Sequence, residues 1–311
     1  LRSGGLPMSN NDALESYSMF ANVYSYMGLP LSRDLTNADL AVLGIPYDLA
    51  TTGRAGTRLG PRAVRQASAN LRWEEKRWPW SFNAFERMAV IDYGDLEFDP
   101  GESQSMVDTV LDHVASIHAQ GSRTLAIGGD HFVTLPLLRG VYAEHGKLAL
   151  VQFDAHTDTY PESSEYDHGG MFHTAPKEGI IDPNRSIQIG IRSEFDANNH
   201  AFEVIDAAAA NDMACADIAA AIFNRVGEMP VYLTFDIDCL DPAYAPGTGT
   251  PVVGGLSTDR ALKILRGLNG LNIVAADVVE VSPPYDHAEI TALAAATIGL
   301  ELIYLMAAVD K

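Results

Sequence analysis

The sequence is poor in cysteine, because its 311 residues include only Cys215 and Cys239. Two cysteines exclude a scaffold built from disulfide bonds and favour a reducing setting, so we expect a cytoplasmic protein. Long apolar runs are missing as well. No stretch of about eighteen uninterrupted apolar residues occurs, which predicts no membrane span. The opening residues also lack the basic-then-apolar pattern of a secretory signal.

Basic residues are few. The chain has 21 Lys and Arg against 41 Asp and Glu, which gives a formal net charge of −20. This charge argues against nucleic acid or an anionic membrane as a partner. It is compatible with a cationic substrate. A charged, solubilising surface is nevertheless the simpler explanation, because steering a substrate needs only the few charges near a cleft.

Internal repeats, low-complexity tracts and Pro/Ser-rich linkers are absent from the sequence, so nothing marks a domain boundary. We expect one domain over residues 34–311, preceded by an N-terminal extension over residues 1–33. The first residue is not Met, and we interpret residues 1–7 as a non-native addition ahead of a start at Met8. The length and a hydrophobic content of 47% suit one large, soluble α/β unit.

Short apolar runs alternate with stretches of helical period along the chain. The alternation predicts a parallel sheet covered by helices on both faces, a three-layer α/β/α sandwich. Ser257 is the expected N-cap of one helix, and residues 288–306 are predicted to form a long, partly buried terminal helix. The predicted strands are residues 40–47, 87–94, 124–129, 147–156, 186–192, 231–238 and 272–281, and the other helices are residues 106–120, 133–145 and 216–227.

Four of these strands end in chemically functional residues. The run LALVQF is followed by Asp154, His156 and Asp158, which point to one face of an extended chain. Carboxylates so close together are unfavourable unless a cation holds them. In α/β folds of this kind the site lies at the carboxyl ends of the strands. Pooling the strand ends gives six candidate metal ligands: His131, Asp154, His156, Asp158, Asp236 and Asp238.

Two imidazoles and four carboxylates are too many ligands, and too rich in oxygen, for one Zn²⁺. They fit two ions that share bridging carboxylates at about 3.5–4 Å. Ligand hardness favours Mn²⁺, although Co²⁺, Ni²⁺ and Zn²⁺ stay open. Taken singly, each motif has a plainer reading as a solvated turn or a hydrogen-bonded core histidine. We expect Gly128 and Gly129 to form a tight turn before His131, and Asp130 to brace a neighbouring ligand rather than bind metal.

Three motifs in order, GGDH, DAHTD and FDIDCLDPAYAPGTGTP, resemble the signatures of the ureohydrolases, the family of arginase and agmatinase. The resemblance runs from about Ala41 to the C-terminus. The segments TTGRAGTRLGPRAVRQASANLRWEE and EYDHGGMFHTAPKEGIIDP are most similar to bacterial agmatinases. One departure is Thr234, where many members carry Ser, and we expect it to leave metal ligation unaffected.

The resemblance implies an arginase-type sandwich around an eight-stranded parallel sheet, two Mn²⁺ per subunit and a homo-oligomer, a trimer or a hexamer. It assigns His131, Asp154, Asp158 and Asp236 to one ion. The other ion would be held by His156, Asp154, Asp236 and Asp238, so that Asp154 and Asp236 bridge. Glu280 matches the carboxylate that binds the substrate guanidinium, and His168 matches a histidine that carries protons. We also expect Thr250 to contact the guanidinium.

The implied reaction is hydrolysis of the guanidinium of agmatine to putrescine and urea. A loop with Glu162, Glu165 and Asp167 and no Lys or Arg suits a substrate with cations at both ends, unless these acids are merely solvated. Another ureohydrolase acting on guanidinobutyrate, guanidinopropionate or arginine is the alternative. A deacetylase on the same fold would need one Zn²⁺ and fewer ligands, and a non-catalytic relative would have lost ligands.

The three tryptophans and one of the cysteines are predicted to have structural roles. Trp73, Trp78 and Trp80 are expected in the core or in a subunit interface rather than at the rim of a pocket. Cys239, beside a predicted metal ligand, is expected to be a small buried residue.

Overall fold

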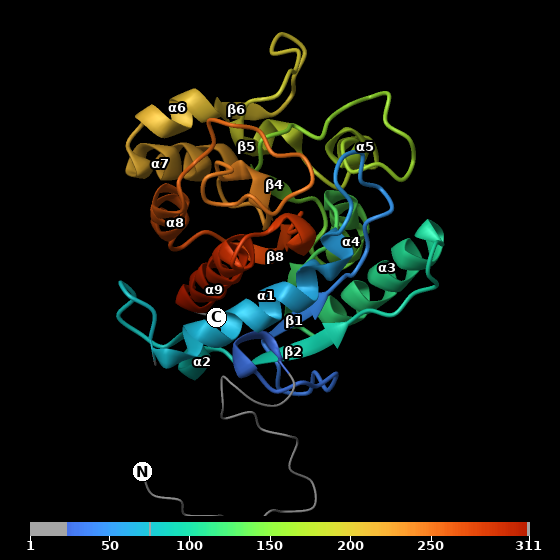
Figure 1. The fold of residues 1–311 in the computed structure, drawn as a ribbon, viewed down its shortest axis with the longest axis vertical. Coiled ribbons are helices and arrows are strands. Elements are labelled where there is room, and N and C mark those ends of the chain that lie inside the picture. Colours follow the sequence, from blue (N-terminus) through green and yellow to red (C-terminus); the bar gives the residue numbers. More distant parts are fainter. Residues whose placement is uncertain (1–23, 75, 310–311) are drawn as a thin grey trace, which may run out of the picture.

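The computed structural model describes residues 24–74 and 76–309. In these residues one parallel sheet forms the middle of the molecule (Figure 1). Its strands are β1 (Leu40–Gly44), β2 (Val90–Asp95), β3 (Arg123–Ile127), β4 (Ala149–Phe153), β5 (Ile187–Ile191), β6 (Glu203–Asp206), β7 (Val231–Asp236) and β8 (Ile273–Val279). They lie in the order β2-β1-β3-β8-β7-β4-β5-β6. The predicted eight-stranded parallel sheet is therefore confirmed.

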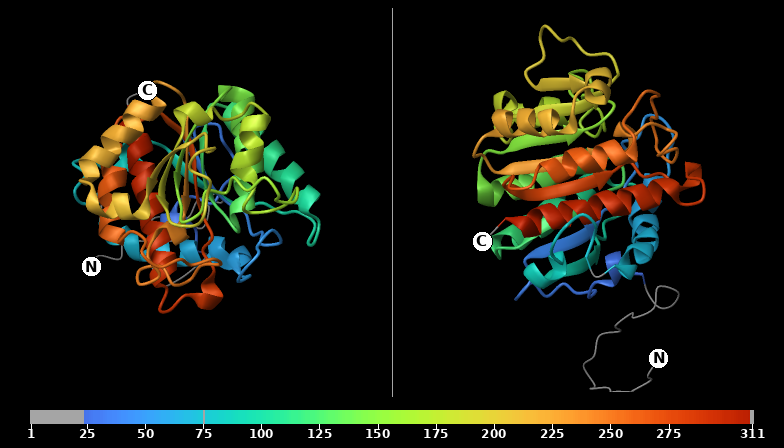
Figure 2. Two further views of the ribbon diagram at one scale, coloured as in Figure 1. Left: turned by 90° about the horizontal axis from the view of Figure 1, so that it is seen from above. Right: turned by 90° about the vertical axis from the view of Figure 1, so that its left-hand side faces the viewer.

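Helices cover both faces of the sheet, which is seen most clearly when the molecule is viewed from above (Figure 2). α3, α4 and α5 lie on one face, and α1, α7, α8 and α9 lie on the other. The three-layer α/β/α sandwich is confirmed. The helices are α1 (Gly60–Ser68), α2 (Ala84–Arg87), α3 (Ser103–Ala119), α4 (Thr134–His145), α5 (Met171–Lys177), α6 (Ala207–Asp212), α7 (Cys215–Val226), α8 (Thr258–Gly267) and α9 (Ile290–Ala308).

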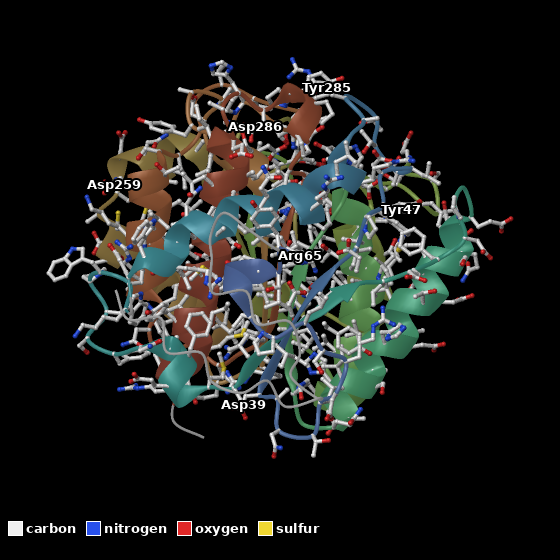
Figure 3. All side chains as sticks on the ribbon, turned by 60° about the horizontal axis from the view of Figure 1, so that its bottom comes forward. Asp39, Tyr47, Arg65, Asp259, Tyr285 and Asp286 are labelled. Carbon is white, nitrogen blue, oxygen red and sulfur yellow. The ribbon has the colours of Figure 1, made fainter. Side chains whose placement is uncertain are left out.

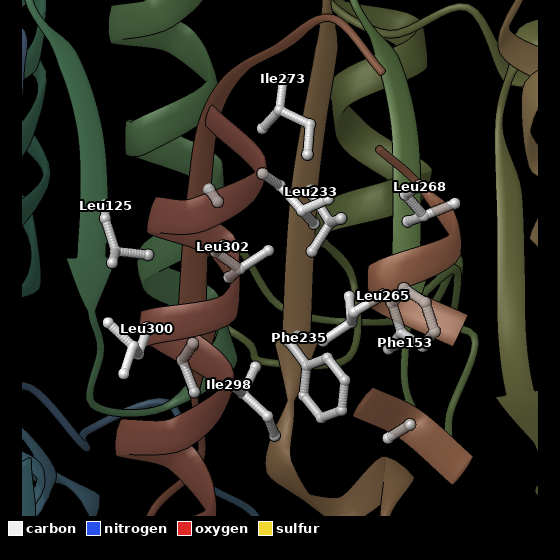
Figure 4. Close-up of a cluster of buried hydrophobic side chains, with 14 of the residues drawn as sticks. Leu125, Phe153, Leu233, Phe235, Leu265, Leu268, Ile273, Ile298, Leu300 and Leu302 are labelled. Carbon is white, nitrogen blue, oxygen red and sulfur yellow. The ribbon is translucent and has the colours of Figure 1, made fainter. Parts of the chain in front are cut away.

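The sheet divides the core into two apolar clusters. Figure 4 shows part of one cluster, in which Leu300 and Leu302 of α9 pack toward strand residues such as Leu233. All three are buried. The other cluster fills the space between the sheet and the helices α3, α4 and α5. Burial of large aliphatic side chains on both faces makes the sheet rigid, and a rigid sheet fixes the positions of the strand ends that carry the site.

The terminal helix α9 is apolar on all sides. Among the described helices it is the one long and apolar enough to cross a membrane, yet 78% of its most apolar window is buried inside the protein. Its burial identifies it as a central helix of the core. A single carboxylate, Glu301, lies fully buried in it and accepts hydrogen bonds from Trp80 Nε1 at 2.7 Å and from Arg266 at 2.5 Å. Two donors from separate segments satisfy this charge.

Hydrogen bonds and an ion pair fix the first described segment and α1 to the edge of the sheet. Arg65 of α1 donates to both carboxylate oxygens of Asp92 on β2, at 2.8 and 3.0 Å, and both side chains are buried. Asp92 Oδ2 also accepts from the backbone N–H of Tyr26. Figure 3 places Arg65 near the middle of the view, whereas Asp39 and Asp259 lie at its periphery.

Strand β6 was not predicted, because its four residues lie at the sheet edge and only Ile205 is buried. Ser257 caps α8 as expected, since its side chain accepts from the backbone N–H of Arg260. Cys239 is buried as expected. The proposed addition over residues 1–7 lies outside the described residues, and the boundary between residues 33 and 34 stays a prediction.

The three tryptophans do not behave alike. Trp80 is half-buried and stacks on Tyr304 with ring centroids 5.5 Å apart, as a core residue would. Trp73 and Trp78 are 75% and 79% exposed, so the core interpretation is wrong for them. Their place in a subunit interface stays a prediction.

Candidate metal centre and active site

The predicted metal ligands meet at one edge of the sheet. They lie at or just after the ends of β3, β4 and β7, and Glu280 follows β8. These four strands are neighbours in the order β3-β8-β7-β4. The carboxyl ends of parallel strands lie at the same edge, so four segments far apart in the sequence converge.

A first cluster forms around His131, whose imidazole lies just after β3. Its Nδ1 atom lies 3.1 Å from Asp154 Oδ2, 2.9 Å from Asp158 Oδ2 and 3.3 Å from Asp236 Oδ2. All four side chains are buried. Ligand atoms about 2.1 Å from one ion and at right angles to each other lie about 3 Å apart, so these spacings suit one coordination sphere.

Hydrogen bonding on the far side of the His131 ring tests whether a metal ion fits. His131 Nε2 lies 2.8 Å from Thr234 Oγ1, and that hydroxyl donates its one proton to Asp277 Oδ1 at 2.5 Å. Thr234 must therefore accept from Nε2–H, which leaves Nδ1 with a lone pair. Nδ1 is buried and makes no hydrogen bond, yet three carboxylate oxygens face it. A metal ion bound between Nδ1 of the neutral ring and these carboxylates would make this arrangement favourable, so the residues fit a metal ion.

A second cluster adjoins the first. His156 Nδ1 lies 3.1 Å from Asp238 Oδ2 and 3.5 Å from Asp154 Oδ1. Asp154 thus faces both imidazoles with a different oxygen, as a bridging ligand does. Each cluster has three side chains whose ligand atoms lie within 4.8 Å of one another. Asp236 belongs to the first cluster and Asp238 to the second, and a bridging role for Asp236 stays a prediction.

The charges in this pocket attract cations. Burial raises the pKa of Asp158 to about 6, and the neighbouring Asp154 charge adds to this effect. Burial alone would lower the pKa of His156, but its carboxylate partners outweigh it and raise that pKa to about 12. The same balance raises the pKa of His131 well above its ordinary value. Either protons or metal ions must neutralise the carboxylates here.

The turn before His131 depends on one glycine. A Cβ atom at Gly129 would lie 1.6 Å from the carbonyl oxygen of Tyr47, so a larger residue would displace the loop after β1. Asp130 binds that loop too, since its Oδ2 accepts from the backbone N–H of Ala50 at 2.9 Å. Its Oδ1 accepts from Phe132 N. Asp130 therefore braces the loop and the turn that carries the proposed ligand His131, and its not binding metal stays a prediction.

Glu280 lies beside the metal-binding clusters. Its Oε1 accepts from the backbone N–H of His131 at 2.9 Å and from His168 Nδ1 at 2.8 Å. Its Oε2 is buried and has no hydrogen-bond partner. A buried carboxylate oxygen without a donor is unfavourable, so a ligand with N–H groups suits this position.

His168 is oriented by two residues. The backbone N–H of Thr52 lies 3.1 Å from His168 Nε2 and can only donate to it, so Nε2 is the acceptor. Nδ1 therefore carries the proton and donates a hydrogen bond to Glu280. Burial would lower the pKa of His168, but the Glu280 carboxylate raises it to about 9. The Thr52 N–H opposes that rise because it favours the neutral ring. Thr52 was missed in the sequence, where TTGRAG carried no recognisable chemistry.

A cleft of about 360 Å³ opens above the clusters. Glu162 and Asp167 line it, whereas Glu165 is not among the lining residues and interacts with Arg139. Thr250 lines it too, and its hydroxyl lies 3.3 Å from Asp238 Oδ2. The other lining residues are Thr52, His131, His156, Asp158, Tyr160, Ser163, His168, Gly169 and Asp236. Among these described residues there is no Lys or Arg.

Comparison with known proteins identifies the same family that the sequence motifs resemble. A family model described as the Arginase family matches residues 38–304. The chain belongs to the arginase family. Enzymes of this family are ureohydrolases that depend on two metal ions, which agrees with the two adjoining clusters.

Among the relatives, an agmatinase of Serratia proteamaculans is 58% identical over 294 residues, which cover 94% of this chain and 95% of that protein. A crystal structure of a hypothetical agmatinase from Burkholderia thailandensis has a TM-score of 0.90 and 48% identity, and covers 93% of this chain and 92% of that one. Proclavaminate amidino hydrolase of Streptomyces clavuligerus has a TM-score of 0.89 at 37% identity, covering 94% and 100%. The fold is thus shared by enzymes with different substrates, and the choice of substrate depends on the cleft.

Proposed function

We propose that this protein hydrolyses the guanidinium group of agmatine, giving putrescine and urea. The observation that carries the proposal is the charge of the cleft: carboxylates at its floor and at its rim, and no Lys or Arg among the described lining residues. Agmatine is cationic at both ends. Arginine carries an α-carboxylate, which would find no cationic partner in this lining. The similarity to agmatinases over almost the whole chain supports the same substrate.

The chain's own side chains bind and orient the substrate. Glu280 Oε2, buried and free of donors, accepts hydrogen bonds from the planar guanidinium and holds its carbon above the clusters. Glu162 and Asp167 lie at the rim and attract the distal ammonium. Thr250 contacts the guanidinium from the side of Asp238.

His168 is the residue that moves protons. Its Nδ1–H is held by Glu280, so Nε2 is the atom that accepts a proton and returns it to the departing amine. Thr52 Oγ1 lies 2.8 Å from Nε2 and can relay that proton.

Two metal ions would be held by His131, Asp154, Asp158 and Asp236 on one side and by His156, Asp154, Asp236 and Asp238 on the other. When bound, such ions supply a water of lowered pKa and charge stabilisation for its attack. The oxygen-rich donor set favours Mn²⁺. We further propose a homo-oligomer, a trimer or a hexamer, in the cytoplasm, and both exposed tryptophans are candidates for its interface.

The substrate is tested by urea release from a panel of guanidino compounds with Mn²⁺-loaded protein. We expect kcat/KM for agmatine to exceed that for arginine by at least about a hundredfold, or roughly 2.7 kcal/mol. If arginine or guanidinobutyrate is the better substrate, the assignment to agmatine is wrong and an unspecified ureohydrolase remains.

The role of the rim is tested separately. Replacing Glu162 and Asp167 together by Gln and Asn should raise KM for agmatine about tenfold with little change in kcat. Glu165→Gln is the matched control, because this acid lies in the same loop but not in the cleft. An unchanged KM in the double variant would remove the rim from the binding site without removing agmatine as the substrate.

A further inference from the structure

Beneath the metal ligands lies a buried side chain that the proposed function does not use. Gln152 is the last but one residue of β4 and is fully buried. Its Nε2 donates to Asp154 Oδ2 at 2.7 Å and to the backbone carbonyl of His156 at 3.1 Å. Gln152 therefore touches two of the proposed ligands at once.

A second amide continues the contact away from the site. Gln152 lies opposite Gln188 in the register of β4 with β5, so both side chains point to the same face of the sheet. Gln188 is fully buried too. Its Nε2 donates to Gln152 Oε1 at 2.5 Å and to the backbone carbonyl of Thr157 at 2.7 Å.

The chain of contacts ends at His200, in the loop before β6. His200 Nε2 lies 2.6 Å from Gln188 Oε1. The imidazole is half-buried and contacts the rings of Phe195 and Phe202, with centroids 5.1 and 5.6 Å away. The aromatic contacts keep the ring in one orientation.

The direction of every hydrogen bond in this chain follows from chemistry. The carbonyls of His156 and Thr157 can only accept, so the NH₂ group of each glutamine must face them. Each Oε1 atom then has to accept, and the Nε2 of His200 must carry a proton. All three side chains consequently donate toward Asp154.

The orientation of the Asp154 carboxylate matters most among the proposed ligands, because Asp154 faces both clusters. Its Oδ2 accepts the hydrogen bond from Gln152 Nε2 and lies 3.1 Å from His131 Nδ1. Its Oδ1 accepts from the backbone N–H of His156 at 2.7 Å. Each oxygen retains one lone pair for an ion. The two hydrogen bonds thus fix the carboxylate plane and direct one oxygen to each cluster.

We propose that Gln152, Gln188 and His200 form a positioning chain that sets the orientation of the shared ligand Asp154 and thereby the affinity for both metal ions. This inference rests on the proposed dinuclear site. It predicts that removing a donor weakens metal binding in proportion to its proximity to Asp154. Loss of an outer hydrogen-bond partner of a ligand typically weakens metal binding about 10- to 100-fold.

The experiment measures Mn²⁺ dissociation constants by electron paramagnetic resonance for the wild type and for Gln152→Met, Gln188→Met and His200→Phe. Met preserves the length of glutamine, and Phe preserves the ring contacts of His200. We expect about 10- to 100-fold weaker binding in Gln152→Met, less in Gln188→Met and about threefold in His200→Phe. The matched control is His113→Phe, since His113 is also half-buried beside an aromatic ring, that of Tyr93, but lies on α3 and outside the lining of the cleft.

A second readout separates positioning from packing. The visible absorption spectrum of Co²⁺-loaded protein should change in Gln152→Met, and the Tm of metal-free protein should fall much less than metal affinity. If Gln152→Met does not fold, the dissociation constants of Gln188→Met and His200→Phe test the inference. Unchanged dissociation constants and spectra in the folded variants overturn the inference alone, because the wild type would still bind two ions. A wild type that binds no ion overturns the dinuclear site and the inference together.

Discussion

Two carboxylates of the candidate site sit on a strained backbone. Asp158 and Glu280 have φ angles of 50° and 64°, in the left-handed region that residues other than glycine rarely adopt. Such conformations are retained where the surrounding structure demands them, and they gather at functional sites. Here they turn each carboxylate back over the sheet edge, Asp158 toward His131 and Glu280 toward His168.

We expect Glu280→Gln to lower kcat/KM at least about a hundredfold while leaving metal content intact. Glutamine keeps the shape of the side chain and still accepts from His131 N at Oε1. It loses the charge that binds the guanidinium, and its NH₂ group would face the N–H groups of the substrate. Urea release and elemental analysis of the same sample test this. Near-normal turnover would show that the guanidinium binds elsewhere.

At the residue scale, the sequence predicted the six proposed ligands because each lies at or just after the end of a recognisable strand. It did not locate Thr52 or Gln188, whose roles depend on contacts across 116 and 36 residues of sequence. It also treated Glu162, Glu165 and Asp167 alike. Only the path of the loop separates Glu165 from the cleft, and that path is not encoded in a local pattern.

At the scale of elements, strongly periodic segments were predictable and short edge segments were not. The terminal helix α9 and the seven inner or longer strands have long apolar patterns. β6 has four residues, two of them charged and exposed, so tertiary pairing with β5 rather than its own sequence makes it a strand. Local propensity is a weak guide where a neighbour supplies the hydrogen bonds.

The packing of α3 against α4 contains a pair of histidines that makes stability depend on pH. His118 is buried, with Nδ1 3.0 Å from His145 Nε2 and Nε2 3.1 Å from Thr124 Oγ1. Burial, with a smaller contribution from His145, lowers the pKa of His118 to about 3. Because the unfolded state takes up a proton near pH 6.5, this stabilisation is complete above that pH and is lost progressively as pH falls toward 3.

We therefore expect the free energy of unfolding to fall by about 2 kcal/mol between pH 7 and pH 5 through His118 alone. His118→Gln removes the titration and should flatten the dependence by that amount, whatever its effect at pH 7. Denaturant unfolding at both pH values measures it. The control is His287→Gln, which replaces an exposed histidine outside this pair. An equally steep dependence in His118→Gln would contradict the assignment.

On the scale of the whole molecule, the sheet places four carboxylates of one pocket within a few ångströms of each other in a protein of net charge −20. Folding without cations must overcome their repulsion and their loss of hydration. The edge of the sheet where β3, β8, β7 and β4 meet is thus destabilising until protons or metal ions neutralise the pocket.

We expect the protein to bind two Mn²⁺ per chain and to be stabilised by them. A ligand present at 100 times its dissociation constant stabilises the folded state by about 2.7 kcal/mol per site, so chelation should lower Tm by several degrees and added Mn²⁺ should restore it. Asp236→Asn removes one charge from the first cluster. It should raise the Tm of the metal-free protein and reduce the increase caused by Mn²⁺, because the repulsion and the ligand disappear together. Calorimetry with and without chelator tests both the higher Tm of the metal-free variant and its smaller increase with Mn²⁺. Elemental analysis gives the number of bound ions. One ion per chain with full activity would contradict the dinuclear site, and a lower metal-free Tm in Asp236→Asn would mean that hydrogen bonds of this carboxylate, such as that from Asp238 N at 2.8 Å, outweigh its repulsion.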